Sequence, residues 1–349
     1  MSLQSVGEFS FDFLSSRPIK FEISPAALSS DTGLLPVRQF DERIGLTERF
    51  ASALEDTRDP SFSTQSVLSM VRQRIYGIIA GYEDQNDHDT LRSDPVFKLI
   101  ANRLPTDRDL ASQPTLSRFE NAVTIADLWR LRDNLVDEFI TSFEEAPLRL
   151  TFDMDAFDDP AHGHQQLIMF HGHYEQYQYL PVVITCAEND AVVLVGLRHG
   201  TCHAALGVDD DLRYLASRLR AVWPDVQIVI RGDGGFATPL MHETCDELRL
   251  IFTIGMGMNP RLKRLSESLL EQAIKTFSET QQPQRLFLPI EYQADSWPAP
   301  RPVVIKVEVH AQGTTDVPLS PIVADGRCNP KASMMSMPCV ARAKIETRN

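Results

Sequence analysis

The sequence predicts an α/β protein in which a mostly helical amino-terminal region precedes a layered sheet. From Thr64 to about residue 145 the apolar residues recur at helical spacing. From Leu148 they alternate with polar residues, as in a half-buried strand. Beyond this switch, consecutive strands are followed by helices that alternate with single strands, an order typical of an α/β layer fold.

In the amino-terminal region, residues 1–45 show no clear period and are expected to form an irregular arm. Helices follow at 64–80 and 95–103, and Thr115 opens a short helix. Thr124 with Asp127 is typical of an N-cap followed by an early acid, and this helix should run to about Phe143.

In the second region the run 226–230 is almost wholly apolar, which suits a central strand covered on both faces. No regular element is expected from Gly313 onward. The other expected elements are strands at 148–154, 165–171, 179–186, 191–198, 249–255, 284–291 and 302–310, and helices at 208–222, 237–247 and 260–276.

Composition limits the function classes. The 349 residues are enough for about two domains. No apolar run is long enough for a membrane helix, no signal peptide is evident, and the five cysteines form no CxxC pair, so we expect a cytoplasmic protein. The net charge of −14 at face value argues against a nucleic-acid partner. The acid excess is steepest around 151–212, however, where carboxylates could serve a metal.

Three aspartates are candidates for such a site. Asp153 and Asp155 lie two residues apart on one expected strand, so both side chains point to the same face. Asp233 lies in the glycine-rich run 231–235, just past the expected central strand. Ligand sites in open α/β sheets lie at such strand ends, and carboxylates suit hard cations. A single strand-end aspartate is usually a turn residue, but two such motifs together favour a metal site for phosphate chemistry.

Other polar residues are less specific. Six of the nine histidines lie between 162 and 203, but no spacing matches a zinc signature, so a surface loop and hairpin is the better interpretation. Arg72, Arg74 and Arg118 lie on expected helices and could face phosphates. Ordinary solvated arginines are equally consistent with the sequence.

Three classes of protein therefore compete. A phosphohydrolase of the haloacid-dehalogenase type carries similar aspartate motifs, but it needs an early helix and a lysine between them, and no lysine lies between Asp155 and Asp233. A metal-dependent nuclease or strand-transfer enzyme with an RNase-H-like fold begins with consecutive strands and then a helix, which matches 148–222. A non-catalytic DNA-binding protein built from the helical half is the third.

Several stretches together resemble the DDE transposases of bacterial insertion sequences, in the branch called transposase DDE domain group 1. The resemblance covers roughly 65–310, and it is the combination of motifs that is specific. The matching stretches are Leu68–Tyr76, Gly81–Asp87, Arg92–Pro95, Leu110–Asn121, Asp153–Gln166, Tyr179–Pro181, Leu197–Gly200 and Ile230–Ala237.

The resemblance implies an RNase-H-like catalytic core with two aspartates and one glutamate that bind two Mg²⁺ or Mn²⁺ ions. Asp155 is the first implied catalytic and metal-binding aspartate, with Asp153 as the alternative, and Asp233 is the second. Arg198 and Arg231 lie in matching motifs and join the candidate DNA contacts.

The implied domains are a helical region at 1–145 that binds inverted repeats, an incomplete catalytic core at 146–312, and a disordered, out-of-frame tail at 313–349. The implied partners are double-stranded DNA, as terminal inverted repeats and target, and a second copy of the chain in a synaptic homodimer. The implied location is the bacterial nucleoid.

The carboxyl end departs from the family, which has Tyr-x-x-Tyr-x-x-Arg-Gly-x-x-Glu on a helix there. The tail from Ser333 has no amphipathic period, and Glu346 has no helical context. In a shifted codon frame, Met334–Met335 must give Asp and Met337–Pro338 must give Ala, and permissible codons elsewhere restore the motif. We therefore expect a frameshift between about 310 and 333, and a truncated, inactive remnant that lacks the third carboxylate.

The nucleotide sequence of the gene tests this expectation. The shifted frame should contain a glutamate codon across the codons of Ala343 and Lys344. Sequencing that finds no glutamate codon there would refute the frameshift.

Overall fold

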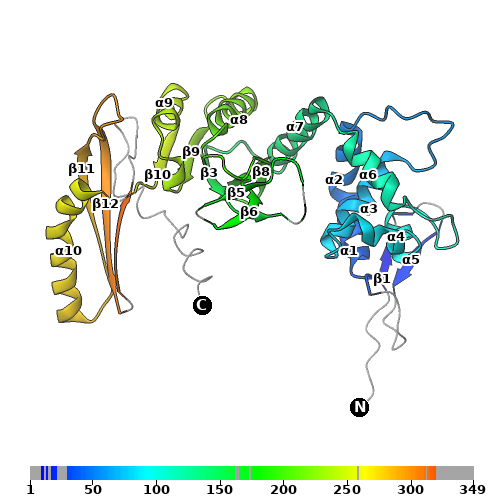
Figure 1. Cartoon of the computed structure of the whole chain (residues 1–349), viewed down its shortest axis with the longest axis horizontal. Coiled ribbons are helices and arrows are strands. Elements are labelled where there is room, and N and C mark those ends of the chain that lie inside the picture. The colour runs from blue at the N-terminus through cyan, green and yellow to red at the C-terminus, as the bar shows by residue number, and fades with distance from the viewer. Residues whose placement is uncertain are drawn as a thin grey trace, which may run out of the picture. The chain divides into compact units, whose positions relative to one another are not determined.

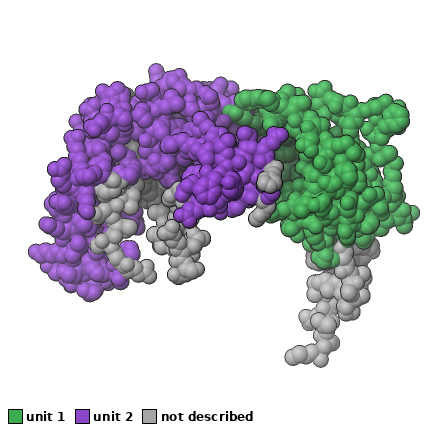
Figure 2. Space-filling view, in the orientation of Figure 1, with its two compact units in different colours: residues 1–134 green, residues 135–349 purple. Residues whose placement is uncertain are grey.

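The computed structural model describes residues 9–11, 13–14, 17–21, 30–161, 163, 165–172, 174–257, 259–311 and 313–319. It forms two compact units, residues 1–134 and 135–349, coloured separately in Figure 2. The division falls inside helix α7 (Ile125–Thr141), about ten residues before the expected boundary at 145. The reason is that Val136 and Phe139, from the second half of α7, are buried in the core of the sheet.

Unit 1 is mostly helical (Figure 1). Strand β1 (Phe9–Phe11) pairs antiparallel with β2 (Ile19–Phe21). The helices are α1 (Leu34–Ile44), α2 (Leu46–Ala53), α3 (Val67–Ile79), α4 (His88–Leu91), α5 (Pro95–Ile100) and α6 (Gln113–Asn121), with a 3₁₀ turn η1 at Gln85–Asp87 and the first half of α7.

Helix α1 lies where the sequence predicted an irregular arm. Its buried residues include the charged pair Arg38 and Asp41 beside Leu34 and Leu35. Two charges on the buried face remove the apolar period that would have revealed the helix.

A buried polar cluster joins α1, α2 and α3. Asp41 accepts hydrogen bonds from the Thr47 backbone N–H at 2.9 Å and from the Tyr76 hydroxyl at 2.8 Å. Arg72 donates to the Thr47 hydroxyl at 3.1 Å. Burial raises the pKa of Tyr76, and its hydrogen bond to Asp41 raises it further. The cluster therefore keeps the phenol protonated and fixes the register of three helices.

Unit 2 contains a five-stranded sheet in the order β10-β9-β3-β7-β8. Its strands are β3 (Arg149–Ala156), β7 (Val182–Cys186), β8 (Val192–Gly196), β9 (Gln227–Gly232) and β10 (Ile251–Ile254). Strands β3, β7 and β8 are antiparallel neighbours, and β9 and β10 run parallel to β3. Helices α8 (Val208–Val222) and α9 (Pro239–Glu247) make the two crossovers. This is the RNase-H-like order, and it confirms the predicted fold class.

The apolar residues decide this arrangement. The predicted central strand is β9, whose Ile228, Val229 and Ile230 are at most 4% exposed. Leu212, Leu215 and Leu219 of α8 are buried in the same core. The strand expected at 165–171 is instead part of a separate small sheet β4-β6-β5, made of β4 (Asp159–Pro160), β5 (Met169–His171) and β6 (Gln176–Tyr179).

After β10 the chain forms a helix that packs on a second antiparallel sheet. Helix α10 (Pro260–Thr280) buries Leu262 and Ala273 against Val303, Ile305 and Val307 of β12 (Arg301–His310). Strand β12 lies between β11 (Gln284–Tyr292) and β13 (Gly313–Leu319). The expectation of no regular element from Gly313 is thus wrong for 313–319, because backbone pairing with β12 forms a strand that side-chain alternation does not reveal. The rest of the expected tail, 320–349, lies outside the described residues.

His242 of α9 lies between the two sheets of unit 2. It is 1% exposed, and neither ring nitrogen has a hydrogen-bond partner among the described residues. Its ring stacks on Phe252 with centroids 5.5 Å apart and meets Trp297 edge-on at 5.1 Å. Burial and, to a smaller extent, nearby Arg301 lower the pKa of His242 to about 4, against a smaller opposing effect of Asp246. The ring is therefore neutral and packs as an aromatic residue.

The stability of unit 2 should fall as the pH falls from about 6.5 to 4, because only the unfolded state readily binds a proton on His242. Protonation of this histidine in the unfolded state should lower the free energy of unfolding by roughly 2 kcal/mol between pH 7 and pH 5. In urea unfolding at the two pH values, His242→Phe should lose correspondingly less stability than the unsubstituted chain. Equal losses in both proteins would contradict the assignment.

Candidate active site

The candidate site lies at the carboxyl ends of two adjacent parallel strands. In the pairing of β3 with β9, Asp153 is opposite Arg231 and Met154 is opposite Gly232. The next residue on each strand is Asp155 and Asp233. Because neighbouring strands are about 4.8 Å apart, the pairing brings these two carboxylates to one edge of the sheet.

Asp233 begins a tight turn. Its carboxylate accepts a hydrogen bond from the Gly235 backbone N–H at 2.8 Å and caps the 3₁₀ turn η2 (Gly234–Phe236). A Cβ on Gly235 would lie 2.8 Å from the Cβ of Ala204, and one on Gly255 would lie 3.1 Å from the Gly234 nitrogen. A side chain at Gly235 would force Ala204 to move, and one at Gly255 would crowd the backbone of the Asp233 turn, because the residue after β10 packs directly against it.

Asp153 and Arg231 form an ion pair across the same two strands. Arg231 donates from Nε and Nη2 to the two oxygens of Asp153, each at 2.6 Å. Their side chains are only 15% and 26% exposed. Arg231, which was expected to contact DNA, therefore forms a two-point ion pair with Asp153, and each side chain neutralises the other. Asp155 is exposed at the sheet edge.

Two other arginines expected to contact DNA have structural roles. The Arg72 side chain is 1% exposed and pairs with Glu48 at 3.3 Å. Arg198 donates to the backbone carbonyls of Leu180 at 2.9 Å and Ala204 at 2.6 Å. Burial lowers the pKa of both guanidinium groups. Arg72 is thus buried and Arg198 half-buried, and sequence patterns do not reveal that both are bound to groups within the protein.

The remaining two candidates differ. Arg74 is 15% exposed and pairs with Glu120 at 2.5 Å, so it is largely neutralised. Arg118 of α6 is exposed and hydrogen-bonds only to the Thr115 hydroxyl at 3.4 Å. Among the described residues it pairs with no carboxylate, and it lines a cavity of about 720 Å³ in unit 1.

The donor set of the Asp155–Asp233 edge suits a hard cation. Carboxylate oxygens are the ligands that Mg²⁺ and Mn²⁺ prefer. Within the described part of the chain, no three His, Cys, Asp or Glu side chains form a metal-binding group. The two aspartates would therefore leave most coordination positions to water or substrate oxygens.

One basic cluster was missed in the sequence analysis. Arg261, Lys263 and Arg264 are exposed in the first turn of α10, which has no acidic residue there. The segment before this helix includes Gly255, which packs on the Asp233 turn. Three bases within four residues directly after a strand were the available signal.

An RNase-H-like sheet with paired aspartates at its carboxyl edge defines a class of metal-dependent nucleic-acid enzymes. The family model for transposase DDE domain group 1 matches residues 11–347. The chain therefore belongs to this family of DNA cleavage and transfer enzymes.

Other comparisons find only distant similarity. No curated protein matches the chain. Among solved structures, a piggyBac transposase synaptic complex with hairpin DNA is similar, with a TM-score of 0.40 and 12% identity, over 83% of this chain and 60% of that one. The chain thus covers about 60% of that transposase. A simian T-cell lymphotropic virus intasome complex, with PP2A regulatory subunit B56 gamma, has a TM-score of 0.22 and 11% identity over 58% of this chain and 92% of that one.

In the described part of the chain, no helix is both long and apolar enough to span a membrane.

The two neighbouring aspartates of β3 should respond differently to substitution. Asp153→Asn should lower the unfolding free energy by about 1–2 kcal/mol, since it leaves the half-buried Arg231 without its charged partner. Asp155→Asn should change it by less than about 0.5 kcal/mol, because Asp155 is exposed. Urea unfolding of the two variants checks this, and an equal loss in both would show that the ion pair does not stabilise β3 against β9.

Proposed function

We propose that this protein is the transposase of a bacterial insertion sequence, which cleaves DNA at terminal inverted repeats and transfers the strand to a target. The observation that supports this most is the placement of Asp155 and Asp233 at adjacent strand ends in a chain of this family. The haloacid-dehalogenase alternative is not supported, because antiparallel β7 follows β3 directly in the sheet.

In the proposed mechanism, Asp155 and Asp233 would hold the divalent cations, Mg²⁺ or Mn²⁺. When bound, such ions help activate water or a 3′-hydroxyl and stabilise the leaving oxygen. The Asp153–Arg231 pair keeps β3 and β9 in register, and so maintains the spacing of the two ligands. The Asp233 turn, held by Gly235 and Gly255, fixes the direction of the second carboxylate.

Among the described residues no third carboxylate joins Asp155 and Asp233, so we propose that the chain is a remnant with weak or no strand transfer. A two-metal site normally needs a third carboxylate, and two aspartates alone should bind two cations poorly. The family match extends to residue 347, which includes the tail. An in-frame tail in which Glu346 supplies the third carboxylate is therefore the competing hypothesis.

Unit 1 is proposed to recognise the inverted repeats and unit 2 to act on the DNA. We also propose that two copies of the chain pair in the synaptic complex, and that the protein works at the bacterial nucleoid. These proposals rest on family membership and on the separation of the helical unit from the catalytic sheet.

A cleavage assay on inverted-repeat duplex DNA with Mg²⁺ or Mn²⁺ tests the proposed function. We expect little or no strand transfer by this chain, and loss of any metal-dependent cleavage in both Asp155→Ala and Asp233→Ala. Robust turnover that both substitutions abolish would support the site and disprove the inactivity. Turnover that persists in both variants would show that the site is wrong.

Two further results would favour the other classes. Hydrolysis of small phosphate esters without DNA cleavage would point to a phosphohydrolase. Sequence-specific DNA binding without metal-dependent cleavage, both in this chain and in a chain whose shifted frame is restored, would point to a DNA-binding protein.

A further inference from the structure

Helix α6 carries an unusual set of polar side chains on one side. Arg118 and Asn121 are exposed, Gln113 and Ser117 are half-buried, and the Asn121 amide donates to the Ser117 carbonyl at 2.8 Å and to its hydroxyl at 3.3 Å. Gln113, Ser117 and Asn121 follow at intervals of four residues, so they lie along one side of the helix, and the exposed Arg118 is next to them. Arginine reads guanine, asparagine and glutamine read adenine, and serine contacts either base. All four residues on this side are thus of types that read base edges.

The opposite side of α6 is fixed to the protein. Leu116 is 0% exposed and clusters with Met70 of α3 and with Ala111. The Gln113 backbone N–H donates to Asp89 at 3.1 Å, which holds the start of the helix. These contacts keep the solvent-facing side rigid, as precise contacts to bases require.

The charges on α6 itself are compatible with DNA. Glu120 is the one acidic residue of the helix, and it is paired with Arg74 at 2.5 Å and also accepts a hydrogen bond from Gln85. Within the described residues, Arg118 pairs with no carboxylate, so its positive charge is available to a ligand. The negative charge on α6 itself is therefore neutralised. In the lining of the adjoining cavity, Asp56 pairs with Arg58, Asp109 with Lys98 and Asp127 with Arg130, while Glu55 and Asp59 add negative charge.

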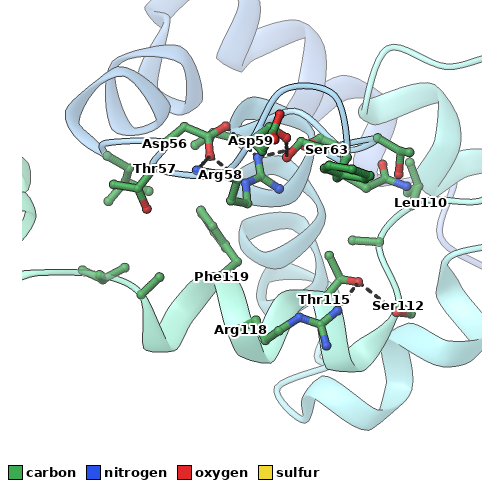
Figure 3. Close-up of a pocket in the computed structure, with 18 of the residues that line it drawn as sticks. Asp56, Thr57, Arg58, Asp59, Ser63, Leu110, Ser112, Thr115, Arg118 and Phe119 are labelled. Carbon is green, nitrogen blue, oxygen red and sulfur yellow. Dashed lines mark hydrogen bonds and ion pairs between the residues drawn. The ribbon is translucent and has the colours of Figure 1, made fainter.

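One flank of α6 is open to solvent. A cavity of about 720 Å³ separates the helix from the 54–67 segment, and Arg108 is also in its lining. Figure 3 shows α6 on one side and the Asp56–Ser63 loop on the other, with Phe119 pointing between them. Arg108 is exposed, and within the part of the chain that the structure describes its guanidinium donates to the Thr64 carbonyl alone, at 2.9 Å. It is therefore a suitable contact for a phosphate beside the helix.

We propose that α6 is the base-reading element of unit 1, with Arg118 as the specificity-determining residue and Arg108 as a phosphate contact. This inference rests on the proposed function, since it requires double-stranded DNA as the partner. The ligand is a duplex whose base edges face Gln113, Ser117, Arg118 and Asn121. Specificity comes from hydrogen bonds to bases, and Arg108 adds affinity without specificity.

The test compares binding of the full chain to two duplexes, one carrying the DNA that flanks this gene and one of shuffled sequence. Arg118→Ala should lower the preference for the flanking DNA roughly tenfold and leave binding to shuffled DNA nearly unchanged. Arg108→Ala should weaken both equally and reduce the dependence of log affinity on log salt by about 1. Arg43→Ala, which removes an exposed arginine of α1 outside the cavity, is the matched control and should change neither affinity by more than about twofold.

The inference is overturned if Arg118→Ala weakens both duplexes equally, if it changes neither, or if the unsubstituted chain shows no preference. Thermal unfolding of each variant checks that these exposed positions leave the fold intact. Asp233→Asn separates this inference from the proposed catalysis: it should remove metal-dependent cleavage and keep the preference for the flanking DNA. If the preference is lost in Arg118→Ala and the unsubstituted chain does not cleave DNA, the result supports the base-reading role of α6 independently of any catalysis.

Discussion

The parallel pairing of β3 with β9 is the constraint on which the candidate site depends. These strands are distant in the sequence, and their register alone brings Asp155 and Asp233 to one edge. A shift of one residue would turn the side chains of either strand to the opposite face. The buried residues of β9 and the ion pair between Asp153 and Arg231 both oppose such a shift. The same interaction therefore maintains the core and the site.

The sequence was sufficient to predict a helix or strand where one face of the element is apolar and the other is polar. The alternation in β3, the apolar run in β9 and the spacing in α8 led to the correct core and to the RNase-H-like order. The two aspartate motifs could be located at strand ends for the same reason, since a strand end can be recognised where an apolar run stops at glycines. The resemblance to the family then linked the two motifs.

The sequence was insufficient to predict the structure where charged side chains are buried or bound within the protein. Arg38 and Asp41 concealed α1, and Arg72 and Arg198 resembled surface arginines although each is bound to groups within the protein. The sequence position of an arginine does not show whether its side chain faces solvent or donates hydrogen bonds to backbone carbonyls. Asp153 and Asp155 could not be separated because they share a face. Only the partner across the strand, Arg231, distinguishes them, and that partner is set by tertiary pairing.

The ion pair at the sheet edge also has an electrostatic consequence for metal stoichiometry. Three aspartates and one arginine give the edge a formal charge of −2, taken as three negative charges and one positive. A single divalent cation makes this edge electrically neutral, whereas a second would leave an excess of two positive charges. That excess could be balanced only by another carboxylate or by the phosphates of bound DNA. Occupancy of a second metal position should therefore be coupled to the arrival of the substrate.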